Sequence, residues 1–115
     1  MGDHTSPCVL TLYIRSYSLM IFEWDSRKSE QNLRVRGFDF GFAALIFDSI
    51  TLEREDDRDD YGEMRTIAIG QAEEVVLTVV YTDRLSARGE IVRRIISARR
   101  SNRRERQLYQ EETEP

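Results

Sequence analysis

Residues 95–109 of the chain read IISARRSNRRERQLY, and this stretch carries the clearest structural signal of the sequence. Its apolar start is typical of the end of a strand, and Asn102 with Glu105 three residues later has the spacing of a helix-starting capping box. The first turn of that helix holds three arginines, where exposed cations oppose the helix macrodipole by about 0.3–1 kcal/mol each. We therefore predict that this segment binds an anion, either a phosphate or an acidic side chain of this protein or of a partner.

The charges of the chain are distributed unevenly. It has 115 residues, enough for one domain with one core, and a formal net charge of −4. Nine arginines and two acids lie between Arg84 and Arg106, whereas seven acids and two arginines lie between Glu53 and Glu63. This predicts one surface that attracts a polyanion and another that repels it or binds a basic partner. The alternative is two solvated charged faces.

Cysteine and histidine are nearly absent. Cys8 is the only cysteine and His4 the only histidine, so we expect no internal disulfide, no metal site and no cofactor. The apolar part of residues 1–19 is short and is interrupted by Arg15, so we expect neither a signal peptide nor a membrane span, and a cytoplasmic location. We expect residues 1–19 to be a poorly ordered extension, with either Met1 or Met20 as the true start.

Two helices are predicted early in a domain over residues 20–112, with residues 113–115 as a tail. Asp25 follows a strand-like segment and is the predicted N-cap of a helix over residues 26–36, which Gly37 ends. Asp39 begins a second helix that ends near Asp48. Its apolar residues have core-packing spacing and are Phe40, Ala43, Ala44 and Phe47.

Strands are predicted in the second half. Ile50 to Leu52 is a candidate for the start of a strand before an acidic loop, and the three main strands cover residues 64–70, 75–82 and 91–99. In the last strand, strict alternation places Arg93 and Arg99 on one face. The predicted order is β-α-α-β-β-β-α, an α+β domain with a small antiparallel sheet.

Several polar residues are candidates for a site on geometric grounds. Lys28, Asn32 and Arg36 follow one another at intervals of four, which places them in one stripe of the predicted helix. A solvated face explains the stripe equally well. Arg65 shares a strand face with two isoleucines. This indicates either that it lies at an exposed strand end or that the cation has a functional role.

The motifs together resemble a known family. They are Phe22-Glu23-Trp24-Asp25, Lys28, Asn32, Gly37-Phe38-Asp39-Phe40, Ala43, Ala44, Phe47, Asp48, Arg65, Ile67, Gly70, Val79-Val80-Tyr81-Thr82 and, most specifically, Arg94-Ile95-Ile96-Ser97-Ala98-Arg99-Arg100 with Arg103-Arg104-Glu105 and Tyr109. Over about residues 20–112, the chain resembles the BrnT toxins of bacterial type II toxin–antitoxin systems.

The resemblance implies a RelE-like fold and a metal-independent endoribonuclease that inhibits translation. It also implies neutralisation by a BrnA-type antitoxin with a ribbon-helix-helix domain. The toxin–antitoxin complex would repress its own operon, and only the antitoxin would contact the operator DNA. A toxin dimer within the complex is one possible stoichiometry.

Roles for individual residues follow from the resemblance and from the chemistry of RNA cleavage. A base must take the 2′-hydroxyl proton, an acid must protonate the leaving oxygen, and cations must stabilise the phosphorane. We expect Arg65 and Arg99 to stabilise that charge in a cleft with Lys28 and Arg36. The residues expected to bind RNA or phosphate are Asn32, Arg94, Arg103 and Arg104.

The chain departs from the family pattern at the end of the first helix. Relatives usually carry Lys-His before the terminating glycine, whereas this chain has Val35-Arg36. Histidine suits proton transfer near neutral pH, but arginine stays protonated. Proton transfer would then fall to Tyr81, Tyr109 or Lys28, or else the chain is a degenerate toxin that binds its antitoxin and co-represses transcription. A weaker alternative is direct DNA binding through the arginine-rich helix.

Overall fold

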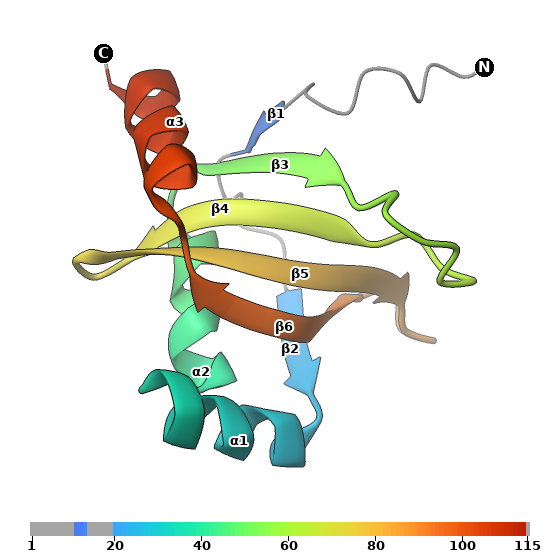
Figure 1. The fold of residues 1–115 in the computed structure, drawn as a ribbon. Coiled ribbons are helices and arrows are strands. Elements are labelled where there is room, and N and C mark those ends of the chain that lie inside the picture. Colours follow the sequence, from blue (N-terminus) through green and yellow to red (C-terminus); the bar gives the residue numbers. More distant parts are fainter. Residues whose placement is uncertain (1–10, 14–19, 115) are drawn as a thin grey trace.

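The fold is built on one sheet. The computed structural model describes residues 11–13 and 20–114, and within them a six-stranded sheet has the order β1-β3-β4-β5-β6-β2 (Figure 1). The strands are β1 (Thr11–Tyr13), β2 (Met20–Trp24), β3 (Thr51–Glu55), β4 (Thr66–Ala72), β5 (Val75–Leu85) and β6 (Ile91–Arg100). The helices are α1 (Ser26–Arg36), α2 (Phe40–Ala43), the 3-10 helix η2 (Ala44–Asp48) and α3 (Arg103–Thr113).

The α+β class is confirmed, but the predicted arrangement of strands is wrong in two respects. Residues 51–55 form a complete strand, so four strands rather than three follow the second helix. Strand β2 runs parallel to β6, so the sheet is mixed rather than antiparallel. The two strands are far apart in sequence, and parallel strands need such a long crossover connection between them.

The terminal segments fall partly outside the described residues. Residues 11–13 of the expected extension form β1, which pairs antiparallel with β3, whereas residues 1–10 and 14–19 are not described. The expected tail begins inside α3, because Thr113 is the last residue of that helix. Among the described residues, none of the helices is long and apolar enough to cross a membrane.

Local sequence determines the two early helices as predicted. The Asp25 side chain accepts hydrogen bonds from the backbone N–H groups of Arg27 and Lys28, and Gly37 ends α1 with a left-handed φ of 87°. Asp39 caps α2 in the same way, by accepting from the Phe42 N–H. The second helix then tightens into η2 instead of remaining α-helical.

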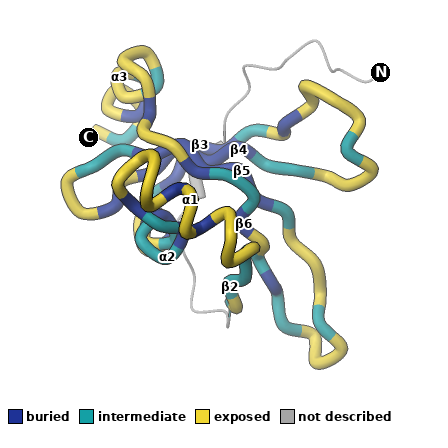
Figure 2. Tube along the Cα trace, turned by 60° about the horizontal axis from the view of Figure 1, so that its bottom comes forward, coloured by how far each residue is buried: buried dark blue, intermediate teal, exposed yellow. Residues whose placement is uncertain are grey.

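The two faces of the sheet are covered unequally. The face under α2 and η2, called the α2 face here, carries the large cluster that includes Phe40, Ile46 and Leu77. The opposite face, the α3 face, carries a small cluster of Leu52, Ile69 and Tyr109. Figure 2 shows the buried residues concentrated in the sheet, while much of α1 and α3 is exposed.

Close packing of η2 on β4 depends on a glycine. A Cβ added at Gly70 would lie 2.8 Å from the Cβ of Ile46 and 3.0 Å from a methyl of Thr51. Neither contact can be relieved by moving a flexible side-chain end. Gly70 therefore lets η2 lie directly on the sheet.

A bulge in β6 reverses its alternation. Val80 of β5 is opposite Ser97 and Tyr81 is opposite Ile95, so Ile96 is the extra residue. Ile95 and Ala98, three positions apart, therefore share the core of the α2 face. The prediction that Arg93 and Arg99 lie on one face is wrong for this reason.

Helix α1 runs beside the part of β6 that has no strand partner on its outer side. Strand β2 pairs only with residues 91–95 of β6, and α1 follows directly after β2 (Figure 1). Arg36 Nη1 donates to the Ala98 carbonyl at 2.7 Å, and Arg100 Nη1 donates to the Arg36 carbonyl at 2.5 Å. Two hydrogen bonds, one donated by each arginine, therefore hold the C-terminal end of α1 against the unpaired edge of β6.

Candidate functional site

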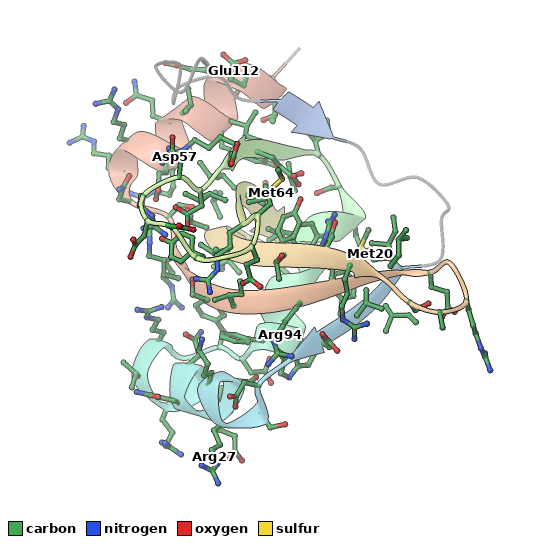
Figure 3. The ribbon with its side chains drawn as sticks, turned by 90° about the vertical axis from the view of Figure 1, so that its right-hand side faces the viewer. Met20, Arg27, Asp57, Met64, Arg94 and Glu112 are labelled. Carbon is green, nitrogen blue, oxygen red and sulfur yellow. The ribbon has the colours of Figure 1, made fainter. Side chains whose placement is uncertain are left out.

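A pocket of about 180 Å³ lies between α1 and the bulged part of β6. It is lined by Lys28, Gln31, Asn32, Val35, Arg36, Phe40, Ile96 and Ser97. The predicted stripe of Lys28, Asn32 and Arg36 therefore lines one pocket, although Lys28 and Arg36 are exposed. Arg27, by contrast, points away from the sheet on the outer side of α1 (Figure 3).

Two members of the stripe also support the local fold. Asn32 is buried, and its Nδ2 donates to the Phe38 carbonyl at 3.0 Å. Its Oδ1 accepts from Arg36 Nη1 at 3.4 Å, so Asn32 helps to hold the guanidinium against β6. Lys28 is exposed, and among the described residues its ammonium has no hydrogen-bond or ion-pair partner. The pocket therefore presents two cations, Arg36 hydrogen-bonded to β6 and Lys28 without a partner among the described residues.

Arg99 lies on the α3 face and is paired with a carboxylate. Its Nη1 and Nη2 donate to Glu105 Oε1 and Oε2, each at 2.8 Å. The hydrogen bond from Arg99 to Glu105 raises the pKa of this arginine. Burial opposes ionisation of Glu105, but the hydrogen bonds from Arg99 and the Asn102 N–H outweigh it and lower the pKa of the carboxyl.

Arg65 and Arg94 are also paired with acids. Arg65 precedes β4, donates from Nε to Glu63 at 3.0 Å and lies 4.0 Å above the ring of Tyr61. Its partner Glu63 belongs to the acidic segment between Glu53 and Glu63. Arg94 lies 3.5 Å from a carboxylate oxygen of Glu23, where β6 runs beside β2 (Figure 3).

Arg103 and Arg104, like Lys28, are exposed cations of the predicted set. Both are exposed in the first turn of α3. Within the described residues neither forms an ion pair, whereas Arg99 beside them is paired. Their charge adds to the positive end of the helix dipole, so the start of α3 favours an anion.

The two tyrosines proposed for proton transfer lie elsewhere. Tyr81 is buried on the α2 face and donates to Glu53 Oε1 at 2.5 Å, and burial raises the pKa of its hydroxyl far above the ordinary value. Tyr109 donates to the Ile50 carbonyl at 2.8 Å, and burial raises its pKa as well. Neither lines the pocket beside α1.

A family model matches most of the chain. The model described as the ribonuclease toxin BrnT of type II toxin–antitoxin systems matches residues 24–105. The chain belongs to the BrnT family. The matched range runs from the end of β2 to Glu105 and so includes the pocket and Arg99. A search of curated proteins found no match.

Membership has direct consequences for this BrnT family member. It is a ribonuclease toxin of a type II toxin–antitoxin system, and such a toxin has a protein antitoxin as its partner. The chain's only histidine, His4, lies outside the described residues. Among the described residues that line the pocket there is no imidazole.

Sequence reasoning missed two features of this BrnT site. Ile96 and Ser97 line the pocket because of the bulge, which no sequence pattern predicted. Glu105 was recognised as a capping residue, and its side chain does accept from the Asn102 N–H at 2.8 Å. Its pairing with Arg99 depends on the geometry of the turn between β6 and α3.

Proposed function

We propose that this BrnT family member is a metal-independent endoribonuclease that cleaves RNA through the 2′-hydroxyl and so inhibits translation. The observation that carries the proposal is the pocket between α1 and β6, where Lys28 and Arg36 lie together. A RelE-like fold is part of the proposal. It is supported by two early helices beside the sheet and a C-terminal helix on the opposite face.

The chemistry needs a cation for the phosphorane and a group that moves a proton. In cleavage, the 2′-oxygen attacks phosphorus while the bond to the 5′-oxygen breaks, so negative charge accumulates on the phosphoryl oxygens. Arg36 uses Nη1 for Ala98 and Asn32, which leaves its other N–H donors for a phosphate. Of the three proton-transfer candidates only Lys28 lines the pocket, so we assign the proton transfer to it.

A metal-independent cleavage needs no divalent cation at the pocket. EDTA should therefore leave the rate of RNA cleavage by the purified toxin unchanged. A rate that falls after EDTA treatment would contradict the metal-independent mechanism.

The remaining arginines are proposed to bind the RNA on either side of the cleaved bond. The backbone would pass around the free edge of β6, from the pocket toward Arg99, Arg103 and Arg104 on the α3 face. Arg65 and Arg94, each already paired with an acid, would add positive potential rather than direct contacts.

Induced expression without the antitoxin tests the function directly. Wild type should arrest growth and degrade RNA, and Lys28→Gln should relieve the arrest because it removes the group assigned to proton transfer. The matched control is Arg27→Gln, which removes one positive charge from the same helix but outside the pocket. Equal toxicity of Lys28→Gln and Arg27→Gln would exclude the pocket as the site.

The antitoxin is proposed to be a ribbon-helix-helix protein of the BrnA type in the cytoplasm. We propose that it alone contacts operator DNA, with the toxin present as one or two copies in the complex. Gel-shift assays with toxin, antitoxin and complex test this. A shift by the toxin alone would support direct DNA binding instead.

One observation favours a second candidate, a degenerate toxin that only binds its antitoxin and co-represses. Arg36 stands where relatives usually carry histidine and is hydrogen-bonded to the backbone of β6. Harmless expression of the wild type, together with intact RNA in vitro and tight antitoxin binding, would support this second function.

A further inference from the structure

The carboxylate of Glu105 gathers donors from three elements of the fold. Its Oε1 accepts from Arg99 Nη1 of β6, from the Asn102 N–H at the start of α3 and from Thr78 Oγ1 of β5, at 2.8, 2.8 and 3.1 Å. Thr78 is buried and is also bonded to the hydroxyl of Ser101 at 2.8 Å. Glu105 is therefore held in one position by groups other than Arg99.

This fixed carboxylate determines which donors of Arg99 remain available. Both Nη1 donors are used, one by Glu105 and one by the Arg100 carbonyl at 3.3 Å, and Nη2 gives one donor to Glu105. A guanidinium has five N–H donors. The two that remain, on Nε and Nη2, lie on one edge of the planar group and form a fork that matches two oxygens of a phosphate.

We propose that Glu105 is a positioning residue, which orients Arg99 so that its Nε–Nη2 edge faces an RNA phosphate. The arginine side chain is 44% exposed, so this edge is accessible from solvent. The inference rests on the proposed ribonuclease function. It adds a residue that touches no substrate and acts only through Arg99.

Steady-state cleavage of an RNA oligonucleotide by the purified full-length toxin tests this role. Glu105→Gln keeps an oxygen for the Asn102 N–H but turns an amide toward Arg99. We expect kcat to fall roughly 10- to 100-fold with KM changed less than about twofold, because misorientation of a charge-stabilising group affects mainly the transition state. Glu112→Gln, an exposed change on the same helix, is the matched control and should equal the wild type.

Two further variants separate positioning from a structural role. Glu105→Asp keeps the negative charge at the start of α3 but is one methylene too short for the same fork, so kcat should again fall. Arg99→Lys keeps the charge and removes the fork, and Glu105→Gln added to it should cause no further loss. A further loss in the double variant, or kinetics of Glu105→Gln equal to or faster than those of Glu112→Gln, would overturn the proposal.

Binding distinguishes this inference from failure of the enzyme function. If the wild type cleaves no RNA, the proposed function fails. The Arg99 Nε–H signal in NMR spectra, recorded during titration with a 2′-deoxy oligonucleotide, then decides the inference. A shift in the wild type that is lost in Glu105→Gln supports positioning, whereas no shift in the wild type, or the same shift in both proteins, overturns it.

Discussion

Arg93 and Arg99 lie on the same strand and form nearly identical ion pairs, yet their surroundings differ. Arg93 donates from Nε and Nη2 to Asp83, and Arg99 donates from Nη1 and Nη2 to Glu105, all at 2.8 Å. The exposed fraction of the side chain is 13% for Arg93 and 44% for Arg99. The same chemistry can therefore serve the fold at one position and remain open to a ligand at the other.

The difference lies in what covers each guanidinium. The guanidinium of Arg93 lies 4.7 Å from the ring centre of Phe47 and 3.9 Å from that of Tyr81. Asp83 occupies the Nε–Nη2 edge of Arg93, which is the edge that Arg99 leaves open. Arg99 has neither aromatic ring near it nor a partner for Nε within the described residues. The bulge at Ile96 separates the two arginines onto opposite faces.

Replacement of Arg93 should have the largest effect on stability. Arg93→Ala removes a largely covered cation above two rings and its pairing with the exposed Asp83, and we expect a loss of about 2 kcal/mol in the free energy of unfolding. Urea denaturation followed by circular dichroism measures it. A loss below about 1 kcal/mol would mean that Arg93 is not part of the folded core.

Replacement of Arg99 should give the complementary result. Arg99→Ala is expected to lower kcat/KM for RNA cleavage about 100-fold, as for loss of one charge-stabilising donor, and to change stability by less than about 1 kcal/mol because the pair is partly exposed. Arg27→Ala serves as the control for lost charge. A large loss of stability with unchanged cleavage would reverse the roles assigned to the two arginines.

Replacement of Tyr81, whose ring lies beside the Arg93 guanidinium, tests what its hydroxyl contributes to stability. Tyr81→Phe removes the hydroxyl that donates to Glu53 and leaves that buried carboxylate with Thr51 Oγ1 as its remaining hydrogen-bond donor. We expect destabilisation by about 1–2 kcal/mol and unchanged cleavage by the folded protein. Loss of cleavage with unchanged stability would instead identify Tyr81 as the proton-transfer group.

The smallest expected effect is the change in folding stability that Glu105 causes as the pH falls. The folded-state pKa of Glu105 is lowered from its ordinary 4.5, so its contribution to stability is complete above about pH 4.5 and is lost as the pH falls through the lower folded-state value. For a partly exposed pair we expect less than about 1 kcal/mol. Thermal unfolding of wild type and Glu105→Gln should therefore converge as the pH is lowered from 6 to 3. A constant difference between the two melting temperatures would contradict this.

Local signals predicted the local structure well. Asp25 and Gly37 gave the bounds of α1 because a cap and a left-handed terminator act within a few residues. The parallel pairing of β2 with β6 was not predictable, since it joins residues about seventy positions apart through tertiary packing. The bulge was equally hidden, because strict alternation is the simplest interpretation of residues 91–99.

In the candidate site, too, local features were predictable from the sequence and tertiary contacts were not. The stripe of Lys28, Asn32 and Arg36 could be derived from helical periodicity, but not that β6 would supply the opposite wall. The arginines near the C-terminus were identifiable by composition. Their carboxylate partners depend on turns and registers that single positions in a sequence do not encode.

The hydrogen bond from Arg36 to Ala98 has an evolutionary consequence. An imidazole at position 36 would supply a proton carrier, but it is shorter than a guanidinium and would leave the Ala98 carbonyl without this donor. Substitution of Arg36 by histidine would therefore exchange a hydrogen bond that holds α1 to β6 for an ionisable group. The two requirements compete at one residue, so a change at the edge of β6 that replaces the lost donor would have to accompany or precede it.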